Sequence, residues 1–339
     1  MTFKRSYRLY YIVLIIMLVL FFLFEIVFGS VSFSFSQIYH ALIDPQEGDL
    51  VSNILWTLRL PKACTALLAG AALSVCGVQM QTLFRNPLAD PYVLGISSGA
   101  GLGVAFFVMG FSAGAFTSAP PWLMNLGITS AAWAGALTVS FIVMAAAKRL
   151  QNTMSLLILG IMIGSVGGAF ISMLQYISSA SALKMYVLWT LGSFVHVTGI
   201  ELIIMTVMIA LGFILSVYNI KDLNVLLMGE TSAKSLGIKM SGIRRRIFIS
   251  TALLAGSVTA FCGPIGFIGI AVPHLARMIF KNANHKVLIP SGALIGASVM
   301  LFADFLSQLS DPALPINTVA ALLGIPVIII IIIQNRSHG

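Results

Sequence analysis

Long apolar runs separated by short polar segments follow one another along almost the whole chain. A helix needs about 20 apolar residues to cross a hydrocarbon core of about 30 Å, and ten runs approach or reach that length. The predicted spans cover residues 10–29, 62–83, 92–110, 122–146, 153–176, 199–219, 245–262, 266–280, 287–309 and 315–334. The run at 266–280 is short, contains Pro273 and ends in Arg277, so we expect a partial or tilted span packed inside protein.

The runs favour helices over strands. Strands of a membrane barrel alternate apolar and polar residues with a period of two, whereas Ile328 to Ile333 form an unbroken apolar stretch. Within lipid every backbone N–H and C=O group needs a partner in the protein, and this requirement overrides the strand preference of isoleucine. The pattern predicts an all-α polytopic membrane protein with about ten transmembrane helices, forming one domain over residues 1–339.

Composition excludes a water-soluble chain. The residues are 59% hydrophobic and only 9% charged, with a mean hydropathy of +1.02, whereas soluble domains carry about 25% charged residues. Disordered, coiled-coil and disulfide-stapled folds are excluded by the same figures. Three cysteines, Cys64, Cys76 and Cys262, lie in or beside apolar runs, where we expect them to pack rather than to bind a metal or act in redox chemistry.

Charge is distributed unevenly between the two sides of the membrane. Ten spans place both termini on one side, and 16 of the 19 Lys and Arg residues fall there. Arg59, Lys62 and Lys184 fall on the other side with seven of the ten acidic residues. The positive-inside rule therefore predicts a protein of the cytoplasmic (inner) membrane with both termini cytoplasmic. The net charge of +9 marks orientation, and we expect no nucleic-acid partner.

The spans hold few groups that could couple transport to an ion gradient. Ion-coupled carriers usually place ionisable residues near the midplane, whereas Glu25 and Asp304 lie near predicted outer ends and are expected to reach the interface. The nearest approach to a phosphate-binding loop, residues 229–235, lacks the glycine before Lys234 and follows no strand. We expect no catalysis and no directly bound cofactor, so any energy for pumping must come from another subunit. An ion-coupled secondary transporter and a channel remain the alternatives from other classes.

Three polar connections are candidates for contact with partners. An outer loop covers about residues 30–60, and a cytoplasmic turn contains Arg85, Asn86 and Pro87. The longest cytoplasmic connection, about 220–244, is predicted to form one short helix with a small-residue face. The residues that define this face and its ends are Gly229, Glu230, Ala233, Leu236 and Gly237. A compact helix that projects from a membrane domain is suited to act as a lever for a soluble partner.

The order of these motifs resembles the FecCD family, the permeases of type II ATP-binding-cassette (ABC) importers for iron–siderophore, haem and vitamin B12. The matching segments are Arg59–Leu60–Pro61–Lys62, Gly70–Ala71–Ala72–Leu73 through Gln79, Arg85–Asn86–Pro87–Leu88–Ala89, Leu94–Gly95–Ile96–Ser97–Ser98–Gly99–Ala100, Leu191–Gly192–Ser193, the 229–237 loop, Gly263–Pro264–Ile265–Gly266–Phe267–Ile268–Gly269 with Val272–Pro273–His274, and Leu323–Gly324–Ile325–Pro326. They span nearly the whole chain in family order.

The resemblance implies a BtuC-like ABC permease fold and a set of partners. These are a second permease copy, expected as a homodimer, two ATPase subunits that use ATP and Mg, and a periplasmic or lipoprotein substrate-binding protein. The 229–237 loop is similar to the coupling helices that enter a cleft of the ATPase. Arg59 and Lys62 match two positions at which the family presents cations to acidic residues of the binding protein.

The chain departs from the family pattern near its last outer connection. Gln308 stands where the family usually has an arginine, and Ala313 and Asn317 replace a glutamate and a glycine. A third docking cation is therefore missing. Three explanations are open: the substrate-binding protein has fewer acidic docking residues, Lys184 takes the place of the missing cation, or the two proteins dock more weakly.

The family's solute path runs along the fifth span and the short helix after it, and this places candidate lining residues between positions 172 and 193. The polar and aromatic members are Gln175, Tyr176, Ser178, Ser179, Ser181, Tyr186, Trp189 and Thr190. Weak polar groups without a charged cage would let a large chelate slide without binding tightly, although helix packing explains most of these residues equally well. The expected cargo is a metal chelate, with iron–siderophore as the default and haem or cobalamin as alternatives.

Overall fold

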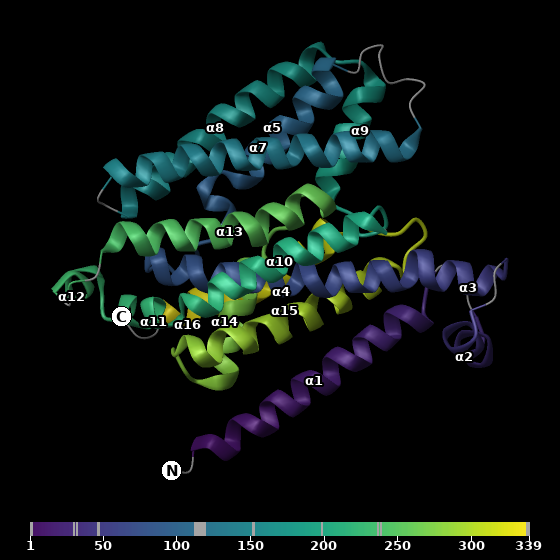
Figure 1. Ribbon diagram of the computed structural model, residues 1–339, viewed down its shortest axis with the longest axis horizontal. Coiled ribbons are helices and arrows are strands. Elements are labelled where there is room, and N and C mark those ends of the chain that lie inside the picture. Colours follow the sequence, from purple (N-terminus) through teal and green to yellow (C-terminus); the bar gives the residue numbers. More distant parts are fainter. Residues whose placement is uncertain are drawn as a thin grey trace.

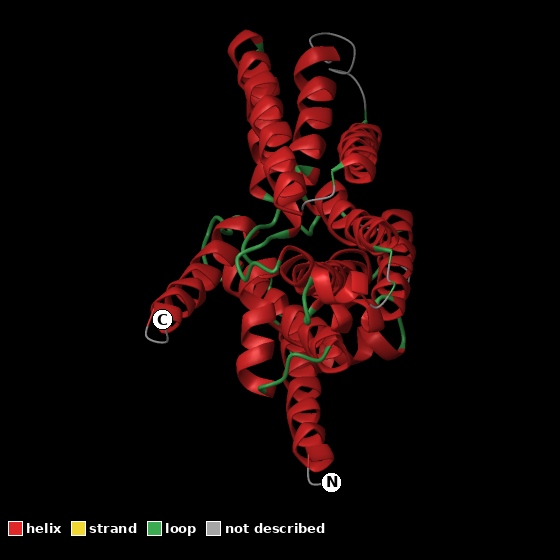
Figure 2. Ribbon diagram, turned by 90° about the vertical axis from the view of Figure 1, so that its left-hand side faces the viewer, coloured by secondary structure: helices red, strands yellow, loops and turns green. Residues whose placement is uncertain are grey.

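The computed structural model describes residues 3–29, 31, 33–45, 48–111, 120–150, 153–197, 199–235, 237 and 239–336. Within these residues the regular structure is helical throughout (Figures 1 and 2). The elements are α1 (Phe3–Val27), α2 (Phe35–Ile43), α3 (Leu50–Ile54), the π-helical turn η1 (Leu55–Arg59), α4 (Leu60–Phe84), the 3-10 turn η2 (Pro91–Leu94), α5 (Ile96–Ala105), the π-helical turn η3 (Phe106–Phe111), α7 (Pro121–Arg149), α8 (Thr153–Ile177), α9 (Ala180–Leu191), α10 (Ile200–Tyr218), α11 (Ile220–Leu226), α12 (Glu230–Ser235), α13 (Met240–Cys262), α14 (Ile268–Phe280), α15 (His285–Ser307) and α16 (Ile316–Arg336).

The predicted spans reappear as helices of two lengths. Seven helices in the described part are long and apolar enough to cross a membrane, and three shorter apolar helices lie at Ile96–Gly110, Ile268–Phe280 and Ile316–Ile330. The all-helical polytopic fold is confirmed, and the predicted number of about ten spans is approximate, since it is reached only when these three shorter apolar helices are counted with the seven. The segment at 266–280 is one of the short helices, as its proline and terminal arginine predicted.

Two segments differ from the predicted boundaries. Helix continues without a break from Leu50 to Phe84, so part of the predicted outer loop belongs to the second span. The connection at 220–244 holds two short helices, α11 and α12, in place of one. In both places the helical turns contain polar residues. A search for apolar runs does not detect such turns.

Helix α4 forms the centre of the bundle (Figure 1). In the most apolar stretch of its span 83% of the residues are buried, against 17% for α1 at the periphery. Helices α10, α13, α14 and α15 pack directly around it, while α5, α7, α8 and α9 form a second layer next to α13. Both ends of the described chain lie at the end of the bundle that carries α12 (Figure 1). We call this end the inner end, following the predicted orientation.

Glycine pairs set the distance between α4 and its neighbours. A Cβ atom on Gly77 would lie 1.9 Å from the carbonyl oxygen of Gly269 in α14, and one on Gly70 would lie 2.1 Å from that of Gly296 in α15. No larger residue fits at such separations. Without a hydrophobic force between helices in lipid, this close backbone contact is the main source of packing energy.

Buried polar groups also link the central helices. The Gln79 Nε2 atom donates to Ser216 Oγ on α10 at 2.9 Å and to Ser250 Oγ on α13 at 3.1 Å. All three side chains are fully buried. Side-chain hydrogen bonds between membrane helices contribute about 1 kcal/mol each. The triad therefore contributes little to stability and serves mainly to fix how α10 and α13 are oriented against α4.

Candidate functional site

The predicted coupling loop, residues 229–237, is built on two glycines and one buried small residue. Gly229 has φ +99° and Gly237 has φ +77°, and both values lie in the region that only glycine adopts without strain. Between them, Ala233 of α12 is fully buried and anchors the short helix against the bundle. Leu236, the remaining member of the predicted face, lies outside the described residues.

Glu230 is held by a buried arginine of α13. The Arg244 Nη2 atom donates to Glu230 Oε1 at 2.8 Å, and Arg244 Nη1 donates to the carbonyl oxygen of Leu150 at 3.2 Å. Leu150 immediately follows α7, and the Arg244 side chain is only 3% exposed. One guanidinium group therefore ties α12 to the inner end of the second helix layer.

A second set of contacts joins the loop to the central layer. Arg246 of α13 forms an ion pair with Asp222 of α11. Asn224 Oδ1 accepts from the His285 backbone nitrogen at 2.9 Å, and His285 Nε2 lies 2.8 Å from Thr82 Oγ1 of α4. Helix α11 is thus fastened to the start of α15 and to the end of α4.

The inner turn predicted at Arg85, Asn86 and Pro87 contacts the coupling loop. Arg85 ends α4 in the left-handed region with φ +48°, and a Cβ atom on Gly229 would lie 3.4 Å from its Nη1 atom. Asn86 Oδ1 accepts from the backbone of Leu88 at 2.9 Å, and the Pro87 carbonyl accepts from His274 Nε2 at 3.2 Å. His274 therefore packs against the 85–87 turn. This turn and the 229–237 loop together form one inner surface.

Asp90 closes this turn. Its Oδ1 atom accepts from the Tyr92 backbone nitrogen at 2.8 Å and so caps η2. Burial against α14 raises the pKa of the Asp90 carboxyl to about 6, although the backbone hydrogen bond acts in the opposite direction. Burial thus makes the Asp90 carboxyl group harder to ionise than an exposed aspartate.

The candidate path residues divide into two groups. Tyr176 is 91% exposed at the end of α8, whereas Tyr186 is only 6% exposed and its hydroxyl faces Gly101 of α5. Several of the others form hydrogen bonds to residues close by in the chain. The hydroxyl groups of Ser178 and Thr190 donate to the carbonyl oxygens of Gln175 and Val187. Ser179 caps the start of α9, and its Oγ atom lies 3.1 Å from Ser181 Oγ. Tyr186 therefore belongs to the packed interior in this conformation.

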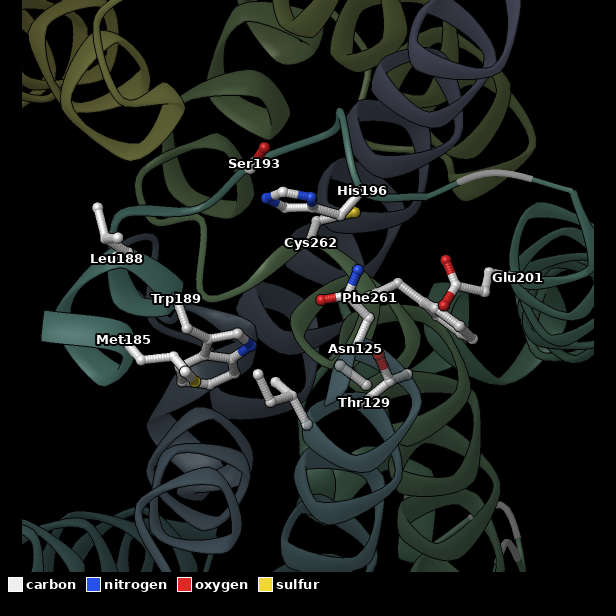
Figure 3. A pocket seen from close by; sticks show the side chains of 12 residues that line it. Asn125, Thr129, Met185, Leu188, Trp189, Ser193, His196, Glu201, Phe261 and Cys262 are labelled. Carbon is white, nitrogen blue, oxygen red and sulfur yellow. The ribbon is translucent and has the colours of Figure 1, made fainter. Parts of the chain in front are cut away.

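Trp189 borders a cavity of about 200 Å³ near the C-terminal end of α9 (Figure 3). Asn125 and Thr129 of α7 and Glu201 of α10 lie across the cavity from it (Figure 3). The indole Nε1 atom is buried without a hydrogen-bond partner among the described residues. The apolar pattern gave no reason to select Asn125, Glu201 or His196, which also lines the cavity, because single polar residues near helix ends are common.

Arg59 points into the protein. Its Nη1 atom donates to the carbonyl oxygens of Ile26 at 2.7 Å and Val27 at 2.9 Å, and its Nη2 atom donates to that of Val31. The guanidinium also lies 4.8 Å from the centre of the Phe33 ring, and the residue is 8% exposed. The cation therefore satisfies the free carbonyls at the end of α1 and complements its dipole.

Lys62 joins two buried carboxylates. Its Nζ atom lies 2.9 Å from Asp304 Oδ2 of α15 and 4.0 Å from Glu25 Oε2 of α1. Gln308 Nε2 donates to the same Glu25 oxygen at 2.8 Å. The expectation that Glu25 and Asp304 reach the interface is wrong, because they are 2% and 3% exposed. The lysine of α4 offers a nearer counter-charge than the headgroup region.

The three departures from the family pattern occupy different surroundings. Gln308 completes the cluster around Glu25, and Asn317 Oδ1 accepts from the backbone of Gly266 at 3.1 Å. Ala313 is exposed. Lys184, the remaining outer cation, is exposed on α9. Gln308 and Asn317 thus both form hydrogen bonds within the chain.

The structure is a polytopic helical bundle with two short helices, α11 and α12, at one end. This is the architecture of a membrane transport protein. The model of the FecCD transport family matches residues 16–334. The chain belongs to the FecCD transport family.

Individual relatives agree with this assignment. The chain is 36% identical over 329 residues to the hemin transport system permease protein HmuU of Yersinia pestis, covering 96% of this chain and 95% of the relative. It is 36% identical over 289 residues to the vitamin B12 import system permease protein BtuC of Klebsiella pneumoniae, covering 84% of each. A solved structure described as an inward-facing conformation of a metal-chelate type ABC transporter superposes with a TM-score of 0.81 at 30% identity, covering 95% of this chain and 97% of that one.

Replacing Lys62 should destabilise the protein strongly. The Lys62→Met variant leaves two buried carboxylates without their counter-charge, and breaking one partner of a buried pair lowers the free energy of unfolding by about 3 kcal/mol. The measurement is thermal unfolding in detergent, with Lys184→Met as the matched control at an exposed outer lysine. Adding Glu25→Gln and Asp304→Asn to Lys62→Met should restore most of the loss. Equal unfolding temperatures for the two single variants would contradict the assignment.

Proposed function

We propose that this chain is the permease subunit of an ABC importer that moves a metal chelate inward across the cytoplasmic membrane. The observation that carries the proposal is the family match over residues 16–334. It is supported by similarity to permeases named for hemin and for vitamin B12, and to a transporter of the metal-chelate type. Iron–siderophore is the cargo we favour, and haem and cobalamin are the alternatives.

The proposed assembly contains a second copy of the chain, two ATPase subunits and a substrate-binding protein. The chain itself binds no cofactor in this proposal, because ATP and Mg are used by the ATPase. Both termini and the inner surface formed by α12 and the 85–87 turn face the cytoplasm. The sixteen predicted inside cations support this orientation.

The geometry suggests how ATPase movement reaches the solute path. Helix α12 is the contact with the ATPase, and Gly229, Ala233 and Gly237 shape it. Glu230 is held by Arg244 and therefore serves to transmit force within the chain. Since Arg244 also holds the end of α7, a displacement of α12 is passed to the layer that contains α8 and α9. The exposed Tyr176 and the cavity at Trp189 lie at the other end of that layer.

The docking role of Arg59 and Lys62 stays a prediction. Both cations have partners within the chain in this conformation, whereas Lys184 has an exposed side chain. Docking through Arg59 or Lys62 therefore requires an acidic residue of the binding protein to compete with carbonyls or carboxylates already in place. Lys184 offers a contact without that competition.

The direct test of function is uptake into proteoliposomes that contain the chain, its ATPase and its binding protein. Labelled iron–siderophore, haem and cobalamin are offered separately, with ATP enclosed or absent. We expect ATP-dependent accumulation of the iron–siderophore. Accumulation of haem or cobalamin in its place would refute the choice of iron–siderophore as cargo and would leave the function as an importer permease standing. Accumulation driven by an ion gradient without ATP would favour a secondary transporter and overturn the proposed function.

Arg244 should matter for coupling more than for assembly. In Arg244→Met we expect the ATPase subunits to bind normally and to hydrolyse ATP, while uptake per ATP falls at least tenfold because α12 no longer moves α7. Lys286→Met, at an exposed cation of the same end that lies outside α7, α12 and α13, is the control and should keep the wild-type ratio. Arg244→Lys should recover part of the ratio, because a lysine replaces the charge but not the two-pronged contact. A normal ratio in Arg244→Met would show that α12 transmits its movement by another route.

A further inference from the structure

A groove lies between α7 and α13 at the inner end of the bundle, away from the cavity and surfaces described above. Its volume is about 480 Å³. Lys148 at the end of α7, Lys239 at the N-cap of α13 and Arg245 on its second turn lie along one part. Phe141 of α7 with Phe248 and Ile249 of α13 lies along the other. The groove therefore has a cationic part and an apolar part.

Helix geometry places these two parts at different depths. Phe141 precedes Lys148 by two turns, so it lies about 10 Å further along the α7 axis from the inner end. On α13, which runs in the opposite direction, Phe248 and Ile249 follow Arg245 by about one turn. The apolar part belongs to the spans Leu123–Arg149 and Met240–Cys262, while the cations lie near the span ends. Phe141 is 66% exposed and Ile249 is 36% exposed, so the apolar part opens at membrane depth.

The cationic part has no local counter-charge. No Asp or Glu lines the groove, and none of the three cations forms an ion pair with a carboxylate in the described part of the chain. The two nearby acidic residues of the coupling region, Glu230 and Asp222, are paired with Arg244 and Arg246. Lys148, Lys239 and Arg245 are exposed and are therefore available to bind an anion.

We propose that this groove binds an anionic phospholipid of the inner leaflet. The phosphate lies among the three cations, and an acyl chain runs along Phe141 and Ile249. Basic pockets between transmembrane helices on the cytoplasmic side are suited to such headgroups. A soluble anion would use only the cations, and a segment of the ATPase would not reach the apolar part within the bilayer. The combination of charge and depth favours a lipid.

The test uses native mass spectrometry of the purified full-length chain with phosphatidylglycerol or phosphatidylcholine as the probe. We expect the wild-type chain to retain one phosphatidylglycerol in preference to phosphatidylcholine. Each cation near a membrane surface strengthens binding roughly fivefold. The variant with Lys148→Gln, Lys239→Gln and Arg245→Gln should therefore bind phosphatidylglycerol on the order of a hundredfold more weakly. Phe141→Ser, at an exposed position, should weaken lipid binding without affecting folding.

The matched control carries Lys221→Gln, Lys281→Gln and Lys286→Gln, which remove three exposed cations of the same end but outside the groove. It should retain phosphatidylglycerol like the wild type. Equal loss in both triple variants would show diffuse attraction to the surface and overturn the site. Displacement of the lipid by millimolar inorganic phosphate would indicate a soluble-anion site. Unchanged lipid retention in the groove variant with lost ATPase binding would assign the groove to the ATPase.

Discussion

The absence of water inside the bilayer is the constraint on which the rest of the structure depends. Backbone groups are satisfied within helices, and helices associate through close contact and a few buried polar groups. Helix α4 shows both. Gly70 and Gly77 bring its backbone against α15 and α14, and Gln79 bonds α10 and α13. A central helix fixed on several sides leaves the second layer, which contains α7, α8 and α9, as the part that is freer to move.

Charged residues follow the same constraint. Arg59 lies against the carbonyl groups at the end of α1, and Lys62 lies between Glu25 and Asp304, so both cations have partners within the protein. At the inner end Arg244 and Arg246 each hold an acidic residue of the coupling region. Charge here serves to fasten short helices to long ones. The cations that lack such partners, in the α7–α13 groove, are therefore candidates for contact with something outside the chain.

The sequence was sufficient for the parts of the fold that depend on local pattern. Apolar runs predicted the spans, and Pro273 with Arg277 predicted a short helix. Partners distant in the chain were not predictable, because hydropathy gives no information on which helices adjoin. Glu25 and Asp304 were expected at the interface for this reason, although they are 279 residues apart in the chain and meet at one lysine. Gly229 and Gly237 were selected from the sequence, and both have positive φ angles in the structure. Arg244 was not selected, because its bonds to Glu230 and Leu150 become visible only when α13, α12 and the end of α7 are seen together.

We propose that the coupling loop moves the second layer relative to α4 and α14. Spin labels at Ile158 on α8 and Met278 on α14, both exposed, report this displacement by pulsed electron paramagnetic resonance in the reconstituted complex, with labelled chain diluted by unlabelled chain. We expect ATP to change the distance between the two labels in the wild type and to leave it unchanged in Arg244→Met. A distance that stays constant in a wild-type complex that is transporting cargo would show that the second layer does not move relative to α14.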